Sequence, residues 1–312
     1  MRHNLSKNKI LVGPARSGTT LACRLLNHNV VENIIALDEP FSREEISEAY
    51  PEDCLELVSL KFVQARKMFK ENKMVPCTIG SEGLDNHYEE STGKKLRKRV
   101  VRVGTMLPQK PLDEEFEIVI KHTIPFTAII EQLSRHYPTY GIVRNPLSIL
   151  ASWNTIDAAY RQGRVPPYVH KVTGDLKWWL PAVRNLFERQ TVLLSWHFEK
   201  LLPLLMDNKV IRYEDIVSSA GRALSVITPK ALNLTASLKS YNENLLYERP
   251  LIEELRLALH RLGGAIWEFY SRREVDGLFE YIGDVDNSSI SPDKPIVRFR
   301  EQRINCYGRD RN

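Results

Sequence analysis

A glycine-bounded segment near the start of the chain has the residue types that bind a phosphate-like anion: Gly13-Pro14-Ala15-Arg16-Ser17-Gly18-Thr19-Thr20. It follows an apolar run of strand length and opens a stretch of helical character. A loop of this kind turns backbone N–H groups toward one point, and the helix dipole favours negative charge there. Gly13 and Gly18 have the Walker A spacing, but Thr19 stands where a nucleotide triphosphatase needs lysine. The segment predicts an anion site whose cation is Arg16.

A second anion-binding pattern occurs where another apolar run ends, at Arg144-Asn145-Pro146. Pro146 suits the first turn of a helix, and Ser152 would lie two turns further along that helix. Arg144 can bind a phosphate with two parallel hydrogen bonds, and Ser152 could donate from the same side. Taken alone, the pattern also describes an arginine at a sheet edge and an unrelated helical serine. Beside the first loop, it favours a second, separate anion site.

Together these segments resemble the sulfotransferases that use 3′-phosphoadenosine-5′-phosphosulfate (PAPS). Residues 16–20 match that family's (K/R)-S-G-(T/S)-(T/S) loop in the arginine form of carbohydrate and bacterial members, and residues 210–216, Val-Ile-Arg-Tyr-Glu-Asp-Ile, resemble its "RYEDL" element. The resemblance implies a three-layer α/β fold of the P-loop-like kind and covers residues 9–155 and 209–217. It assigns the 5′-phosphosulfate to Arg16, Ser17, Gly18, Thr19 and Thr20, the 3′-phosphate to Arg144 and Ser152, and a place beside the nucleotide to Tyr213. Glu214 and Asp215 are equally consistent with acidic residues at a helix start.

The C-terminal R-K-G-x-x-G-D-W segment of cytosolic members is absent from this chain. Arg298, Arg300 or Arg303 could replace its cation, and the sequence leaves this open.

Two residues are candidates for the base that deprotonates the acceptor. Glu39, in Asp38-Glu39-Pro40, resembles the "EP" element of carbohydrate-type members, and Pro40 is expected to hold Glu39 in an extended conformation. His122 has the better intrinsic pKa. However, it lies in a "KTHLP"-like element with His and Thr exchanged, which could turn it to the other face of the strand. We predict Glu39 as the base, with His122 second, and expect Lys121 or a neighbouring cation to stabilise the departing phosphate.

Three other classes of function are less consistent with the sequence. Residues 34–39 resemble a Walker B strand, so an ATP- or GTP-dependent kinase or NTPase is the main alternative. Thr19 and the Arg144/Ser152 pair argue against it. An inactive scaffold would have lost Arg16 or the base candidates. A nucleic-acid binder would show aromatic residues interleaved with its basic patch, and the net charge is only +5.

The expected reaction is sulfonyl transfer from PAPS to a hydroxyl or amine of a small-molecule or carbohydrate acceptor, with PAP as product.

The elements that must position these residues follow from the apolar pattern. The chain has 312 residues, 43% of them hydrophobic, enough for a single domain with a full core. Continuous apolar runs alternate with amphipathic stretches, which predicts an α/β fold with a mostly parallel sheet covered by helices on both faces. The predicted strands are 9–13, 33–37, 117–121, 139–143 and 209–212. The predicted helices are 19–27, 44–49, 55–71, 126–136, 147–159, 175–188, 191–206 and 251–272.

Two segments interrupt this alternation. Residues 76–111 form an insertion with a basic cluster, interpreted either as a solvated face or as a lid that attracts an anion: Lys94, Lys95, Arg97, Lys98, Arg99 and Arg102. Residues 281–312 are polar and predict a tail or flap. The scattered cysteines suggest reduced thiols and no metal site. The lack of a signal-peptide pattern or long apolar run suggests a cytoplasmic protein without a membrane partner. The acceptor and the oligomeric state cannot be derived, although Trp153, Trp178, Trp179, Tyr160 and Tyr168 could wall an acceptor pocket.

Overall fold

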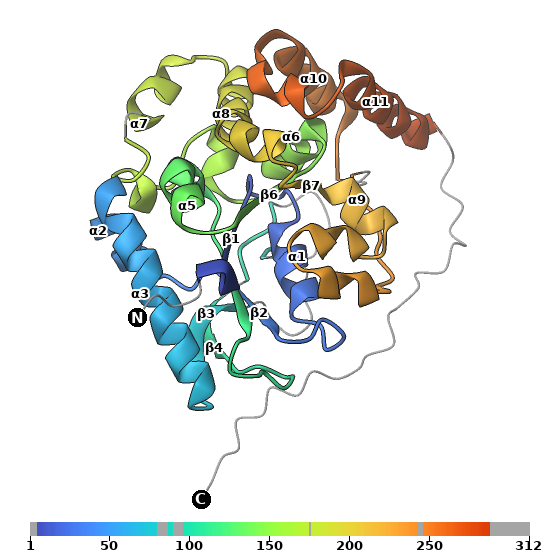
Figure 1. The fold of residues 1–312 in the computed structure, drawn as a ribbon. Helices are drawn as coiled ribbons and strands as arrows, with labels where there is room; N and C mark the ends of the chain where they lie inside the picture. The colour runs from blue at the N-terminus through green and yellow to red at the C-terminus, as the bar shows by residue number, and fades with distance from the viewer. Residues whose placement is uncertain are drawn as a thin grey trace, which may run out of the picture.

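The structure is a computed structural model that describes residues 5–79, 87–89, 96–100, 102–174, 176–242 and 246–287. Within these ranges, five parallel strands form a central sheet in the order β2-β5-β1-β6-β7 (Figure 1). Their bounds are β1 Asn8–Val12, β2 Ile34–Asp38, β5 Glu117–Lys121, β6 Thr139–Val143 and β7 Val210–Arg212. Each bound lies within one residue of the predicted strand. The α/β fold with a parallel sheet flanked by helices is therefore confirmed.

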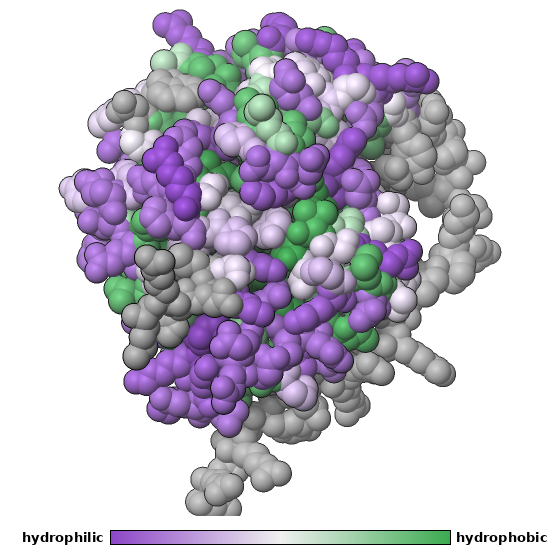
Figure 2. Space-filling model, in the orientation of Figure 1, coloured by the Kyte–Doolittle hydropathy of each residue, from purple (hydrophilic) through white to green (hydrophobic). Residues whose placement is uncertain are grey.

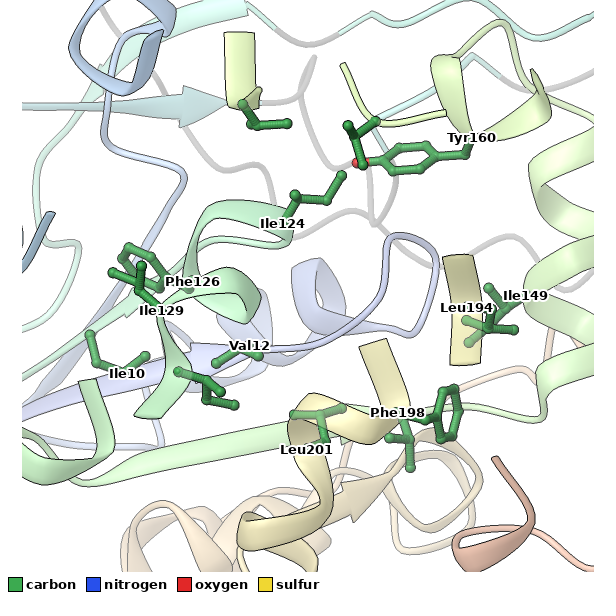
Figure 3. Packing of buried hydrophobic residues seen from close by; sticks show 14 of the residues in the cluster. Ile10, Val12, Ile124, Phe126, Ile129, Ile149, Tyr160, Leu194, Phe198 and Leu201 are labelled. Atoms are coloured by element: carbon green, nitrogen blue, oxygen red, sulfur yellow. The ribbon is translucent and has the colours of Figure 1, made fainter. Parts of the chain in front are cut away.

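Successive residues of each strand enter two different hydrophobic cores, because strand side chains alternate between faces. Ile10 and Val12 of β1 point into the larger core (Figure 3). Five helices contribute to that core: α3 (Pro51–Lys70), α4 (Ile124–Ala128), α5 (Ile130–His136), α6 (Pro146–Asn154) and α8 (Leu186–Met206). Leu11 lies between Ile10 and Val12 in the sequence and packs into the smaller core with α1 (Thr19–Leu26) and α9 (Tyr213–Ser218). Both faces of the sheet are thus buried, which explains why its strands are continuous apolar runs.

Five helices each correspond to one prediction: Thr19–Leu26 (α1), Arg43–Glu48 (α2), Pro51–Lys70 (α3), Pro146–Asn154 (α6) and Leu186–Met206 (α8). The bounds of α1 and α2 lie within one residue of the prediction. Helix α3 begins four residues earlier than predicted, α8 begins five residues earlier, and α6 ends five residues earlier. Residues 126–136 form two short helices, Ile124–Ala128 (α4) and Ile130–His136 (α5). Tyr213–Ser218 (α9) follows β7 directly.

The predictions for 175–188 and 251–272 were wrong in extent. In the first segment helix α7 covers only Leu176–Trp179, and Pro181, which has no N–H to donate, lies in the short 3₁₀ turn that follows. Asn185 then caps the start of α8 with its side chain. In the second segment helix α10 covers Arg249–Leu262, so it ends ten residues before the predicted end. A separate helix, α11, covers Arg272–Asn287 and extends into the predicted tail. The rest of that tail lies outside the described residues.

The insertion contains a small sheet that the sequence did not predict. Strands β3 (Val75–Ile79) and β4 (Arg102–Met106) pair antiparallel. Between them, residues 87–89 and 97–100 also pair, through a bridge from Tyr88 to Arg99. Thr78 and Arg99 reach the loop that follows β2, so the insertion lies against the main sheet.

The strand order determines where a site can form. β1 lies between β5 and β6, so the chain connections diverge to opposite sides at its carboxyl end. Open parallel sheets bind ligands at such a crevice. The loops after all five strands begin at this edge: Gly13, Glu39, His122, Arg144 and Tyr213.

Hydrophilic residues cover most of the face shown in Figure 2, and the hydrophobic residues on this face lie in small, separate groups. No helix within the described parts of the chain combines the length and apolar character needed to cross a membrane.

Candidate active site

The loop after β1 has a backbone shape that requires its glycines. A Cβ on Gly13 would lie 2.2 Å from the carbonyl oxygen of Ile142. Gly18 has φ +98°, and a Cβ there would lie 2.7 Å from Cδ2 of Tyr213. Arg16 also has a positive φ, of 75°, which an L-residue adopts only at a cost of about 1 kcal/mol or more. The predicted loop is thus a tight, partly strained turn held between β6 and Tyr213.

The start of α1 offers hydrogen-bond donors at this loop. Gly18 is the N-cap, and no side chain among the described residues caps the helix. The Ser17 hydroxyl is fully buried and has no hydrogen-bond partner within the described structure. Unsatisfied donors at a helix start, together with a buried unpartnered hydroxyl, form a site suited to an anion.

The two predicted anion-binding motifs are in direct contact. Arg16 Nε donates to Ser152 Oγ at 3.0 Å, and Arg144 Nη1 donates to the carbonyl oxygen of Arg16 at 3.1 Å. Trp153 Nε1 donates to the carbonyl oxygen of Ala15 at 2.9 Å, which ties helix α6 to the loop. The structure therefore brings Arg16, Arg144 and Ser152 together, although the sequence analysis described them as parts of two separate anion sites.

Arg144 is positioned by neutral partners. Its side chain is buried, with Arg144 exposed by only 4%. Nε donates to Asn242 Oδ1 at 2.7 Å, and Nη2 donates to the carbonyl oxygen of Tyr241. A guanidinium has five N–H donors, so these bonds and the one to Arg16 leave two without a partner among the described residues. Asn242 was missed by the sequence analysis, because it lies in an irregular segment with no recognisable pattern.

Tyr213 and Glu214 support this arrangement. The Tyr213 ring lies 4.8 Å from the Arg144 guanidinium, and its hydroxyl accepts from the backbone N of Tyr241 at 3.0 Å. Glu214 accepts from the backbone N of Asn145 at 2.9 Å and from Asn242 Nδ2 at 2.8 Å. Tyr213 thus lies beside Gly18 of the loop, and Glu214 braces the residues that hold Arg144.

A buried network of charged groups joins the ends of β2 and β5. Lys121, exposed by only 1%, donates to Asp38 Oδ1 at 2.8 Å and to Glu39 Oε1 at 3.1 Å. His87 Nε2 lies 2.8 Å from the other carboxylate oxygen of Asp38 and 3.3 Å from Thr20 Oγ1. The network therefore reaches from Glu39 to the threonine at the start of α1.

The pKa values in this network follow from its geometry. Burial alone would raise the pKa of Glu39, but Lys121, with His122 and His87, lowers it to about 2. Asp38 is affected in the same way, since Lys121 and His87 outweigh its burial and keep its pKa well below the usual range. Burial would lower the pKa of Lys121, yet the two carboxylates raise it above normal. All three groups are charged at neutral pH.

The predicted extended conformation of Glu39 was wrong. Glu39 has φ +48°, in the left-handed region, although Pro40 follows it. The pairing of β2 with β5 continues to the Glu39 amide, which donates to the carbonyl oxygen of Lys121 at 2.9 Å. Thr78 donates to the Glu39 carbonyl oxygen at 3.3 Å. These bonds and the Lys121 contact hold a backbone conformation that local preference disfavours, as is common at functional sites.

His122 lies in a different environment from Glu39. It is 3% exposed, and its ring lies 6.1 Å from that of Phe41 and 5.7 Å from that of Phe126. Its Nδ1 accepts from the backbone N of Thr123 at 3.0 Å. Burial lowers the pKa of His122 to about 4, even though Glu39 acts in the opposite direction. The ring is neutral and partly enclosed by aromatic residues.

The insertion contributes residues to the site. Tyr88 places its ring 5.4 Å from the Arg16 guanidinium, and Arg99 lies 3.3 Å from Glu39 Oε2. Arg97 is buried near Arg16 and Arg144. The pKa of Arg16 is lowered to about 10 by burial and by the positive charges of Arg97 and Arg144. The solvated-face interpretation is therefore wrong for Arg97. Lys98 and Arg99 are exposed, although Arg99 still contacts Glu39.

The aromatic residues proposed for an acceptor pocket are divided by the structure. Trp153 is core and stacks on Tyr160, with ring centroids 5.3 Å apart. Burial, together with the negative charge of Glu39, raises the pKa of Tyr168 to about 12. Trp178 is 71% exposed, away from any core. The side chain of Trp179, the basic residues Lys94 and Lys95, and Arg298, Arg300 and Arg303 lie outside what the structure describes.

Within the described ranges, no cluster of three or more His, Cys, Asp or Glu side chains is arranged to hold a metal ion. Comparison of this chain with protein-family models, with curated proteins and with solved structures found no match in any of the three.

Proposed function

We propose that this protein is a PAPS-dependent sulfotransferase that transfers a sulfonyl group to a hydroxyl or amine of a small-molecule or carbohydrate acceptor. The observation that carries the proposal is the contact between the two motifs, in which Arg16 bonds Ser152 and Arg144 bonds the Arg16 carbonyl. PAPS has two separate anionic ends. Two cationic motifs that meet at one sheet edge offer one group of donors for each end.

The donor would lie across the carboxyl ends of β1 and β6. The loop amides, Ser17, Thr19, Thr20 and Arg16 would hold the 5′-phosphosulfate at the start of α1. The two available N–H groups of Arg144, with the Ser152 hydroxyl, would hold the 3′-phosphate. Tyr213, which contacts both Gly18 and Arg144, would lie beside the nucleotide.

The reaction would be an in-line displacement at sulfur. The acceptor oxygen or nitrogen attacks the sulfur atom as its proton passes to Glu39. The bond from sulfur to the bridging phosphate oxygen breaks, and PAP leaves with the electron pair. Arg16 and the loop amides would stabilise the charge that develops on the departing phosphate.

We assign the base to Glu39 because its carboxylate is ionised and belongs to the network that reaches Thr20 at the start of α1 through Lys121, Asp38 and His87. The low pKa of Glu39 makes it a weak base. A bound donor would bring negative charge close to Lys121, which opposes the effect of Lys121 on Glu39 and raises that pKa. Lys121, enclosed between two carboxylates, would act mainly by positioning Glu39. His122 is neutral but has one ring nitrogen occupied, so it remains the second candidate.

The kinase or NTPase alternative requires an acidic residue available to Mg²⁺, and the Walker B-like residues 34–39 end in two such residues. Lys121 and Arg99 occupy the two carboxylate oxygens of Glu39. The other residue is Asp38. Lys121 and His87 occupy its two carboxylate oxygens. No specific observation therefore favours that alternative.

Ligand-dependent thermal stability tests the proposal. PAP at a hundred times its Kd should stabilise the protein by about 2.7 kcal/mol, and ATP at the same concentration should do far less. Excess EDTA should leave the PAP effect intact, and Arg144→Ala should remove most of it. Transfer of radiolabelled sulfur from PAPS to an acceptor mixture would then show activity. Protection by Mg-ATP without protection by PAP would establish the kinase alternative instead.

A further inference from the structure

The insertion places an arginine inside the candidate site. Arg97 is 7% exposed, although its neighbours in the sequence form a polar, basic segment. Its backbone bonds hold it in place. The Arg97 amide donates to the carbonyl oxygen of Thr155 at 3.0 Å, and its own carbonyl accepts from the Asp157 amide at 3.0 Å. These bonds form a parallel bridge between Arg97 and Ile156. The main-chain position of Arg97 is therefore fixed against the end of helix α6.

The Arg97 side chain is directed along helix α6 toward Ser152. Nη2 donates to Thr155 Oγ1 at 2.6 Å, and the same hydroxyl donates to the carbonyl oxygen of Ser152 at 2.9 Å. Ser152 Oγ in turn accepts from Arg16. The Arg97 guanidinium thus lies one side chain away from the serine expected to contact the 3′-phosphate.

The charge of Arg97 is not neutralised by the described part of the protein. Its Nε is buried and has no hydrogen-bond partner there, and no carboxylate among those residues forms an ion pair with it. The charges nearest to it include that of Arg144, which is also positive. A buried arginine among like charges is unfavourable unless an anion accompanies it.

We infer that Arg97 is a binding residue for the 3′-phosphate of the nucleotide, supplied by the insertion and acting with Arg144 and Ser152. The inference rests on the proposed function and adds a residue that neither sequence motif contains. It also gives the site a third cation, in a chain that lacks the C-terminal basic segment of cytosolic members.

Paired titrations with PAP and with AMP, which lacks only the 3′-phosphate, test this inference by calorimetry. Arg97→Gln should weaken PAP binding about tenfold or more, as expected for the loss of a charged hydrogen bond, and should leave AMP binding within twofold. Lys98→Gln is the matched control, because it removes the same charge from the neighbouring exposed position. Lys98→Gln should change neither affinity by more than twofold.

The melting temperature of the ligand-free protein separates binding from a structural role. If Arg97 is positioned for a ligand, Arg97→Gln should melt at or above the wild-type temperature. A lower melting temperature with unchanged PAP affinity would overturn the inference, and so would equal losses of PAP and AMP binding. If Arg97→Gln does not fold, Thr155→Val, which removes the hydroxyl that holds Nη2, should weaken PAP binding a few-fold and spare AMP; wild-type affinity in that variant would overturn the inference.

The same titrations distinguish the two proposals. Wild-type protein that does not bind PAP more tightly than AMP contradicts the proposed function and the role of Arg97 with it. Wild-type protein that prefers PAP, with an Arg97→Gln variant that keeps this preference, contradicts only the role of Arg97.

Discussion

Replacing Lys121 with methionine tests how much the buried ion pairs between the ends of β2 and β5 contribute to the free energy of unfolding. Lys121 is 1% exposed and bonds Asp38 at 2.8 Å and Glu39 at 3.1 Å. Methionine has a similar length but no charge, so it leaves two carboxylates buried beside each other. Removing one partner of a buried ion pair costs about 3–5 kcal/mol. Asp38 keeps His87 and Glu39 keeps Arg99, so we expect Lys121→Met to lose about 3 kcal/mol at pH 7.

The pH dependence of that loss gives a sharper test. In the wild type the pKa of Glu39 is lowered from 4.5 to about 2, so its stabilising effect is complete above about pH 4.5 and is lost as the pH falls toward 2. Wild-type stability should therefore change little through this pair between pH 7 and pH 5. In Lys121→Met the two carboxylates repel each other and one pKa rises above its unfolded value. The folded variant then binds more protons than the unfolded chain, and its stability should increase on acidification by up to about 1.4 kcal/mol per pH unit.

Urea denaturation of both proteins at pH 5, 6 and 7 measures these effects. Lys209→Met is the control, because it removes a lysine from an exposed pair with Asp207 at 2.9 Å, and we expect no measurable change. A loss below 1 kcal/mol at pH 7 for Lys121→Met, with the wild-type pH dependence, would refute the reasoning. It would mean that water reaches the two carboxylates and replaces the lysine.

Two further predictions concern the loop and the base. Gly18→Ala should lower the free energy of unfolding by about 1–2 kcal/mol and weaken PAP binding. The reason is that residue 18 has φ +98°, and a Cβ there would lie 2.7 Å from Cδ2 of the Tyr213 ring. Gly174→Ala is its control in the same denaturation assay, since Gly174 also has a positive φ, +56°, but a Cβ there would contact nothing within 4 Å. A Gly18→Ala variant no less stable than Gly174→Ala would show that the Tyr213 contact is unimportant. Glu39→Gln should reduce turnover by at least about a hundredfold with PAP affinity retained, whereas His122→Asn should cost far less; the opposite order in a sulfate-transfer assay would make His122 the base.

The sequence by itself determined the sheet and the loops at its carboxyl edge. Strands buried on both faces must be apolar at every position, so β1, β2, β5, β6 and β7 were recognisable as short continuous runs. The glycine loop was recognisable because its backbone requires residues without a Cβ, and Gly13 and Gly18 meet that requirement. Parallel strands present their carboxyl ends at one edge, so the loops that carry Arg16 and Arg144 lie at the same edge of the sheet.

The tertiary structure decided which charged residues are buried and what they contact. Arg97 lies in a basic segment that looks solvated, and only the packing of that segment buries it. The exposed Arg99 of the same segment contacts Glu39 through the same packing. Asn242 supports Arg144 from 98 residues away, through a contact that no local pattern encodes. Glu39 departs from the extended conformation favoured before proline because several long-range hydrogen bonds together outweigh one local preference. Local preferences depend on neighbouring residues and can be read along the chain, whereas burial and charge pairing depend on segments that become neighbours only when the chain folds.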